Sequence, residues 1–156
     1  MATKKMAIIA TKGALDMAYP PLILASTAAA LGWEVQVFFT FYGLQLLRKD
    51  LSGIAISPLG NPAMPMPVPM PVVVAMLPGM EAMATSMMKA KMKKKGVASL
   101  EELRGVCQEA DVKFIACQMT VDLFDFSKSD FIDGVEYGGA ATFMKFAGES
   151  DVCLFI

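Results

Sequence analysis

The chain has 156 residues, of which 55% are hydrophobic, so a single domain with its own core is the simplest organisation. Its net charge of −1 gives no electrostatic basis for a nucleic-acid partner. The sequence contains no histidine, which excludes Ser-His-Asp and Cys-His catalysis and imidazole metal ligands, and leaves cysteine, carboxylate, lysine, tyrosine and backbone groups.

Hydrophobic patterning in the first third of the chain predicts short strands that alternate with helices. In chain order, the patterns predict a strand at 5–11, a helix that ends at Leu31, a strand at 34–41, a short helix at 42–49 and a brief strand at 53–56. Gly32 occupies the position at which glycine commonly stops a helix. Three alanines of that first helix, Ala25, Ala28 and Ala29, would allow it to lie close to a sheet.

The segment at 57–79 is predicted to be a long irregular loop, rich in proline and methionine. No charged residue lies between Asp50 and Glu81, and seven prolines interrupt this stretch. Alternating prolines cannot sustain a membrane-spanning helix, so no membrane span is expected. Nine of the fourteen methionines lie between Met64 and Met92, which fits either a soft Cu(I) site or an adaptable packing surface.

The second half of the chain continues the alternation. In chain order, it predicts a helix at 80–95, a helix that opens at Ser99, a strand at 112–117, a helix from 138–139 to 147 and a closing strand at 151–156. Lysines concentrate at the end of the first of these helices, where the helix dipole favours them, and Gly96 follows. Ser99 and Glu102 have the spacing of a capping box. The segment between the strand at 112–117 and Gly138 is mixed, and it begins with a turn or short helix.

Strands that alternate with helices and are too apolar to have a solvent-exposed face indicate an α/β domain. In such a domain a parallel sheet is covered by helices on both faces. No internal repeat or domain boundary interrupts the pattern, so a single domain over residues 1–156 is predicted. Open parallel sheets bind ligands beyond the carboxyl ends of their strands. Candidate functional residues are therefore those at the strand ends.

Cys117 stands at such an end, where an apolar run stops. The backbone N–H groups of Gln118, Met119 and Thr120 follow it and are expected to point toward its sulfur, which would lower the pKa of the thiol and favour the nucleophilic thiolate. Lys12, at the end of the first strand, is the candidate cation if those two strands are neighbours. The alternative is that Cys117 is one more small buried hydrophobe, which is common for free cysteine.

The other two cysteines are predicted to be buried and inert. Cys107 falls on an apolar helix face and Cys153 lies inside the last strand. Three distant cysteines without a C-x-x-C motif support neither a zinc site nor a dithiol, and they favour a reducing compartment. No glycine-rich nucleotide motif follows a strand, and no signal-peptide pattern opens the chain, so no organic cofactor is predicted and the cytoplasm is the expected location.

Five segments, in order, resemble one family over almost the whole chain; they read LILASTAAALGWEVQVFFTFYGLQLL, GVASLEEL, KFIACQMT, DGVEYGGAATF and DVCLFI. With the NPAMPMP loop, they resemble the DsrE/DsrF/DsrH-like family, and more narrowly its DsrE-like sulfurtransferases, some of which are described as peroxiredoxin-like. The resemblance implies a flavodoxin-like three-layer fold that assembles as trimers or hexamers. It also implies cytoplasmic sulfur trafficking, in which Cys117 holds sulfane sulfur as a persulfide and exchanges it with TusA-like or rhodanese-like proteins.

The function expected from the sequence is thus a sulfur carrier or sulfurtransferase that uses Cys117 and needs no metal or organic cofactor. Two alternatives stay open. A thiol peroxidase would oxidise Cys117 to a sulfenic acid, which a partner thiol then resolves. A non-catalytic assembly or soft-metal-binding module would work through the loop at 57–79. The apolar surface of that loop also favours a homo-oligomer.

Overall fold

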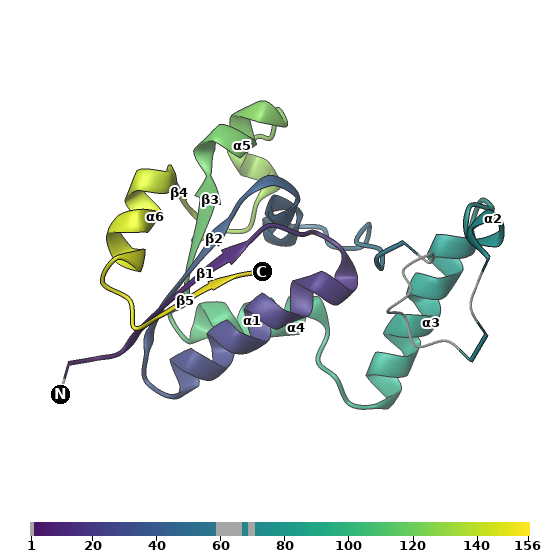
Figure 1. The fold of residues 1–156 in the computed structure, drawn as a ribbon, viewed down its shortest axis with the longest axis horizontal. Coiled ribbons are helices and arrows are strands. Elements are labelled where there is room, and N and C mark those ends of the chain that lie inside the picture. The colour runs from purple at the N-terminus through teal and green to yellow at the C-terminus, as the bar shows by residue number, and fades with distance from the viewer. Residues whose placement is uncertain (1, 59–66, 69–70) are drawn as a thin grey trace.

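Five parallel strands form the central sheet of the computed structural model, which describes residues 2–58, 67–68 and 71–156 (Figure 1). The strands are β1 (Lys5–Ala10), β2 (Glu34–Phe39), β3 (Lys113–Cys117), β4 (Glu136–Gly138) and β5 (Val152–Phe155). Their order across the sheet is β4-β3-β2-β1-β5, and every neighbouring pair is parallel. The predicted parallel α/β sheet is confirmed, and one edge of it carries the carboxyl ends of all five strands.

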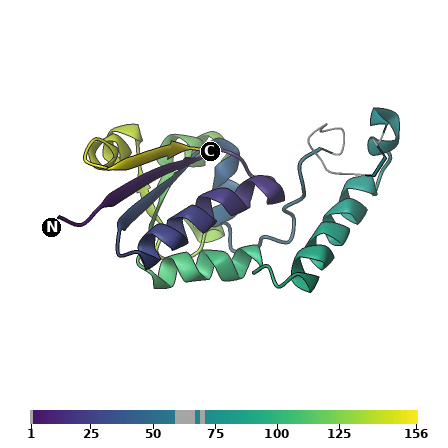
Figure 2. The ribbon, with the colours of Figure 1, turned by 60° about the horizontal axis from the view of Figure 1, so that its bottom comes forward.

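Helices cover both faces of this sheet. α1 (Leu15–Ala30) and α4 (Leu100–Glu109) lie side by side on one face, and α6 (Ala140–Ala147) lies on the other (Figure 1). The other helical segments are η1 (Phe41–Leu47), α2 (Val72–Ala75), α3 (Met80–Lys94), α5 (Gln118–Leu123) and η2 (Lys128–Asp130). α2 and α3 extend to one side of this layered body and do not cover the sheet (Figure 2).

Alternation along the strands divides the core between the two faces. In β1, Met6, Ile8 and Ala10 belong to the larger core, which α1 and α4 close. Ala7 points the other way into a smaller core, which α6 closes with Phe143. The strands are apolar on both sides because both faces are covered.

Two predicted helix-end signals are confirmed. Ser99 Oγ accepts a hydrogen bond from Glu102 N at 3.1 Å, and the Glu102 carboxylate accepts one from Ser99 N at 2.7 Å. This capping box opens α4. Gly32 has a φ of +80° just after the end of α1, a conformation that glycine adopts without steric cost.

The segment at 53–56 is not a strand, and that prediction is wrong. Its isoleucines are buried, as in a strand, but its backbone groups bond to helices. Ala55 O accepts a hydrogen bond from Leu15 N at 2.7 Å, and Ile56 N donates to Thr85 Oγ at 3.2 Å. The apolar pattern therefore reflects burial alone, because no strand in the described part of the chain pairs with this segment.

The structure contains two short elements that the sequence pattern did not predict, β4 and α2. β4 has three residues, too few to show alternation, and it lies in the segment described above as mixed. α2 lies within the predicted irregular loop at 57–79. Residues 59–66 and 69–70 of that loop are outside the described part of the chain, and with them most of the methionine-proline motif considered for Cu(I).

α3 is confirmed as a helix with lysines at its carboxyl end. It turns Ala84, Thr85 and Met88 toward the body of the domain. Met83 and Met87 of the same helix are exposed. The methionines of this helix are thus divided between packed and exposed positions.

Backbone packs directly on backbone where β1 and β2 end. Gly43 in η1 lies against the carbonyl group of Ala10, and Gly13 lies against the carbonyl group of Tyr42. A Cβ atom on either glycine would lie closer to these carbonyl groups than side chains tolerate. The same Ala10 oxygen accepts a hydrogen bond from Thr40 N at 3.1 Å. The two glycines therefore allow η1 to pack over the carboxyl end of β1.

Buried Arg104 of α4 holds the other end of η1. Its Nη1 donates to the carbonyl oxygens of Leu46 at 2.8 Å and Arg48 at 2.6 Å. The end of a short helix leaves such carbonyl groups without an intrahelical partner. A charged donor satisfies them here, so η1 is fixed at both ends.

Gly43→Ala is expected to lower the free energy of unfolding by about 1–3 kcal/mol, because the added methyl group overlaps a backbone carbonyl that cannot rotate away. Gly53→Ala is the control, since a Cβ atom at that position meets nothing within 4 Å. Urea denaturation of both variants measures the difference. Equal midpoints for the two variants would contradict the close packing of η1 on β1.

Candidate functional site

Cys117 ends β3 and is the residue from which α5 begins. Its side chain belongs to the smaller core, with Phe38, Ile115 and Phe143, and only 5% of the residue is exposed. The predicted position at the carboxyl edge of the sheet is confirmed. The sulfur is nevertheless largely covered, so its chemistry depends on the groups that surround it.

Four groups that can donate hydrogen bonds to a thiolate favour the charged form of Cys117. They are the hydroxyl groups of Thr120 and Thr40 and the backbone N–H groups of Thr120 and Met119. Burial by itself raises the pKa of the Cys117 thiol, whereas each donor lowers it by favouring the charged thiolate. The donors outweigh burial, so the pKa of Cys117 lies below its ordinary value. The thiolate is the nucleophilic form of cysteine.

The two threonine hydroxyl groups are held in place by hydrogen bonds to each other and to the backbone. Thr40 Oγ1 and Thr120 Oγ1 are 3.1 Å apart, and Thr120 Oγ1 accepts a hydrogen bond from Phe41 N at 3.3 Å. A hydroxyl oxygen can accept two hydrogen bonds but has only one proton to donate. The bond between the two hydroxyl groups uses one of their two protons, so the pair has one hydroxyl proton left for the sulfur of Cys117.

Phe41 has an uncommon backbone conformation at this point. Its φ is +48°, in the left-handed region, which costs a residue with a side chain about 1–2 kcal/mol. This conformation accompanies two contacts: the N–H group faces Thr120, and the ring packs edge-on against Phe124 with centroids 6.4 Å apart. Strained backbone of this kind clusters at functional sites.

The structure separates the predicted supporting residues into two groups. It brings Met119 and Thr120 to Cys117, as predicted. The backbone N–H group of Gln118 is not among the groups that lower the pKa of Cys117, and the side chain of Gln118 donates from Nε2 to Asp122 Oδ1 at 2.7 Å. The condition set for Lys12 is not met: β2 lies between β1 and β3, so the strands that end near Lys12 and Cys117 are not neighbours.

Thr40 is the residue that the sequence analysis missed. It directly follows β2, the strand that separates β1 from β3. The register pairs Phe39 with Ala116, so the next residues along the two strands are Thr40 and Cys117. The sequence signal was a threonine at a strand end, and its meaning depends on a strand order that periodicity does not reveal.

The other two thiols have different environments. Cys107 is fully buried, donates from Sγ to Leu22 O at 3.3 Å, and has a pKa that burial raises to about 11. Its predicted burial is confirmed. Cys153 is exposed, with Sγ donating to Ala147 O at 3.3 Å, so its predicted burial is wrong. β5 is an edge strand, and its alternate residues, Cys153 and Phe155, are left largely uncovered.

Exposed apolar side chains form a rim where the residues beside Cys117 reach the surface. The rim consists of Phe41, Tyr42, Met119 and Leu123, each between 44% and 65% exposed. Tyr42 stacks on Phe124 with ring centroids 6.1 Å apart, which ties η1 to the residue that follows α5. The buried thiol is thus bordered by an apolar surface with two aromatic rings.

Within the described ranges, no cluster of three or more cysteine, aspartate or glutamate side chains could hold a metal ion. In the same part of the chain, no helix is long and apolar enough to cross a membrane.

The sequence profile of the DsrE/DsrF/DrsH-like family matches residues 2–155. The chain belongs to this family. It is 70% identical to the sulfur carrier protein DsrE2 of Allochromatium vinosum over 160 aligned positions, which cover all of both chains. It is also 34% identical to the uncharacterized protein YrkE of Bacillus subtilis, over 99% of this chain and 98% of YrkE.

Among solved structures, the fold is similar to that of the ychN protein from E. coli. The TM-score is 0.56 at 14% sequence identity, and the match covers 99% of this chain and all of ychN. The α/β fold expected from the family resemblance is confirmed by this similarity.

Thr120→Val is expected to raise the pKa of Cys117, because it removes a hydroxyl donor to the thiolate. A hydrogen bond to a charged group contributes about 1.5–3 kcal/mol, so the thiolate fraction at neutral pH should fall by about ten- to a hundredfold. The pH dependence of alkylation by iodoacetamide measures this shift. It is followed in a Cys153→Ser background, so that the exposed thiol does not contribute.

Thr120→Ser is the matched control, since it keeps the hydroxyl group, and its alkylation midpoint should stay near that of the parent. Thr40→Val should also move the midpoint to higher pH. A midpoint that is unchanged in Thr120→Val would show that the hydroxyl does not stabilise the thiolate.

Proposed function

We propose that this protein is a cytoplasmic sulfur carrier that accepts sulfane sulfur as a persulfide on Cys117 and passes it to a partner thiol. The observation that carries the proposal is the buried thiol of Cys117 at the carboxyl edge of the sheet, with four donors that favour its thiolate. The 70% identity to a protein named as a sulfur carrier supports the same assignment.

The exchange has two steps, each of which forms one sulfur–sulfur bond and breaks another. The Cys117 thiolate attacks the outer sulfur of a donor persulfide, so that Cys117-S-SH forms and the donor leaves as a thiolate. An acceptor thiolate then attacks the outer sulfur of Cys117-S-SH and releases the Cys117 thiolate. No net oxidation or reduction occurs, and the rates follow thiolate fraction, leaving-group pKa and access.

Thr40 and Thr120 act in both steps. In the first step, their hydroxyl groups stabilise the attacking thiolate, and in the second they stabilise the same thiolate as it leaves. Phe41 N donates to Thr120 Oγ1 and so helps to hold the two hydroxyl groups beside the sulfur. None of these roles requires a metal or an organic cofactor.

Donor and acceptor proteins meet Cys117 at the apolar rim. A thiol with 5% exposure has little open surface, so a partner must bring its own sulfur close to the carboxyl edge of the sheet. Tyr42 and Phe41 offer aromatic surface there, the kind of surface that dominates protein–protein contacts. Proteins of the rhodanese-like and TusA-like kinds are the proposed partners.

Assembly into trimers or hexamers stays a prediction. Val72 and Val73 of α2 and Met83 and Met87 of α3 are exposed, and a neighbouring subunit could cover them.

Incubation with polysulfide is expected to add about 32 Da per sulfur atom to the protein, and a thiol reductant should remove the added mass, because a persulfide is an exchangeable S–S bond. Cys117→Ser should abolish the adduct. Cys107→Ser and Cys153→Ser should keep it, and the second of these is the sharper control because Cys153 is exposed. Intact-protein mass spectrometry measures the loading. Loading that persists in Cys117→Ser would place the active thiol elsewhere.

Hydrogen peroxide separates the carrier from a thiol peroxidase. A carrier should consume peroxide only slowly, through oxidation of Cys117, whereas a peroxidase should turn over many equivalents in the presence of a thiol reductant. Rapid peroxide turnover without loading by polysulfide would assign the peroxidase function.

Tyr42→Ala is expected to slow loading from a persulfidated rhodanese about tenfold, because it removes an aromatic side chain from the proposed contact surface. Loading from polysulfide should be unchanged, since a small donor needs no docking surface. Leu31→Ala is the control: Leu31 is equally apolar and 69% exposed, but it follows α1 at the opposite edge of the sheet. Equal loss with both donors would show that Tyr42 acts on Cys117 itself and not on docking.

A further inference from the structure

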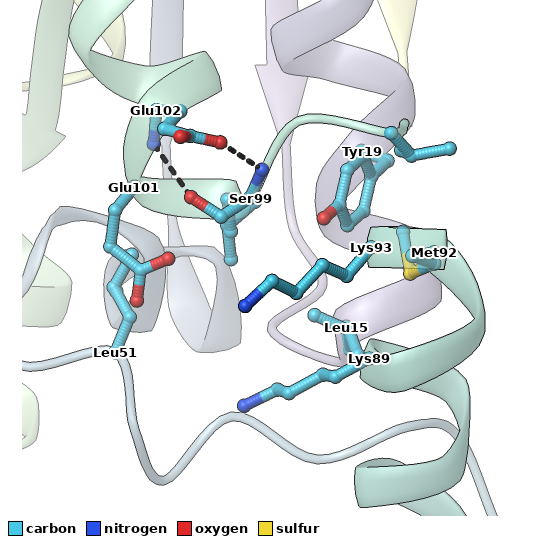
Figure 3. A pocket seen from close by; sticks show the side chains of 11 residues that line it. Leu15, Tyr19, Leu51, Lys89, Met92, Lys93, Ser99, Glu101 and Glu102 are labelled. Atoms are coloured by element: carbon cyan, nitrogen blue, oxygen red, sulfur yellow. Dashed lines mark hydrogen bonds between the residues drawn. The ribbon is translucent and has the colours of Figure 1, made fainter. Parts of the chain in front are cut away.

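A cavity of about 420 Å³ lies between α1, α3 and α4, separate from the Cys117 site (Figure 3). Its volume falls in the range of pockets that hold small organic molecules. Leu15, Leu51 and Leu100 form an apolar floor, and Met92 and Val97 add apolar wall. The cavity can therefore accept the apolar part of a ligand.

Charged groups gather at one side of this cavity. Lys89 and Lys93, one helical turn apart on α3, direct their ammonium groups into it, toward the side where Glu101 lies (Figure 3). Among the described residues, no carboxylate oxygen lies within 4.0 Å of either ammonium group. Glu102 is engaged in the capping box with Ser99, so its carboxylate is already used.

The lining thus carries two ammonium groups and two carboxylates, but the Glu102 carboxylate is held at Ser99 N, and neither ammonium group has a carboxylate oxygen within 4.0 Å. Lys89 and Lys93 are both exposed, and two like charges at this spacing on a helix repel each other. A bound anion would relieve this repulsion. The remaining polar group of the wall, the Tyr19 hydroxyl, already donates to Ala98 O at 3.0 Å and does not compete for the ligand.

We propose that this cavity binds a small amphipathic anion, in which an apolar chain contacts the leucine floor and a sulfate, phosphate or carboxylate head group contacts Lys89 and Lys93. The site is independent of sulfur transfer, because none of the residues that line it surrounds Cys117. Lys89 and Lys93 come from α3, whereas Leu15 and Leu100 come from α1 and α4, so the ligand contacts the projecting helix and the layered body together.

A consequence of this arrangement concerns α3. Its described contacts with the body rest on few groups, chiefly Ala84, Thr85 and Met88. A ligand that touches both sides of the cavity binds only when α3 lies against the body, and it should therefore favour that position by mass action. The amides of α3 should exchange their hydrogens more slowly when the ligand is bound.

Calorimetric titration of the full chain with octyl sulfate tests the proposal. Octyl sulfate is expected to bind at one site, while octanol, octyltrimethylammonium and inorganic sulfate, which each lack one part of the recognised chemistry, should bind much more weakly. Lys89→Gln and Lys93→Gln should each weaken octyl sulfate binding about three- to tenfold, as expected for the loss of one charged contact that is partly exposed. Octyl phosphate and octanoate then rank the head groups.

Lys94→Gln is the matched control, because Lys94 is an exposed lysine of the same helix that does not line the cavity. It should leave the affinity unchanged. Slower hydrogen exchange across α3 with octyl sulfate, lost in the Lys89→Gln/Lys93→Gln double variant, would support the site by a second measurement. Absence of saturable binding, equal binding of octyltrimethylammonium, or an equal loss in Lys94→Gln would overturn the proposal.

Discussion

The packing of Gly43 against the carbonyl group of Ala10 is the constraint on which the candidate site depends. It allows η1 to start directly after β2 and to pack over the end of β1. Thr40 and Phe41 stand at that start, so the path of η1 decides where the Thr40 hydroxyl and the Phe41 N–H group lie. Both reach Thr120 across the carboxyl edge of the sheet. A side chain at position 43 would displace these donors together.

The effect of those donors is visible from a comparison inside the chain. Cys107 and Cys117 are both buried, at 0% and 5% exposure. Burial dominates at Cys107 and raises its pKa to about 11. At Cys117 burial acts in the same direction, but hydroxyl and amide donors reverse the net shift. Ser26 also donates to Cys107, but there the donors do not offset the burial of the thiol, whereas at Cys117 they do.

Much of the fold could be predicted from local patterns. The parallel sheet, the capping box at Ser99 and the stop at Gly32 follow from signals that lie within a few residues. The segment at 53–56 could not be assigned, because alternation reports burial and says nothing about whether a strand pairs alongside. The predicted burial of Cys153 was wrong for a related reason. A strand at the edge of a sheet has the same sequence pattern as a strand at its centre.

The candidate site shows the same division. Cys117, Met119 and Thr120 are close in sequence, so the end of one strand was enough to find them. Thr40 is distant from Cys117 in sequence, and it lies beside Cys117 because β2 is the neighbour of β3. The same strand order places β2 between Cys117 and the strand that ends near Lys12. Groups that converge from different strands become predictable only when the strand order is known.

A single cluster of donors that stabilises one thiolate has a consequence for the proposed exchange. The Cys117 thiolate is the nucleophile when sulfur arrives and the leaving group when sulfur departs, so Thr40 and Thr120 raise the thiolate fraction for the first step and improve the leaving group in the second. Because the thiolate is the unloaded form of Cys117, these donors favour release of sulfur over its retention on Cys117. The net direction of sulfur flow is still set by the relative stability of the persulfides on the two partners. The apolar rim around Phe41 and Tyr42 determines which partners can come close enough to exchange.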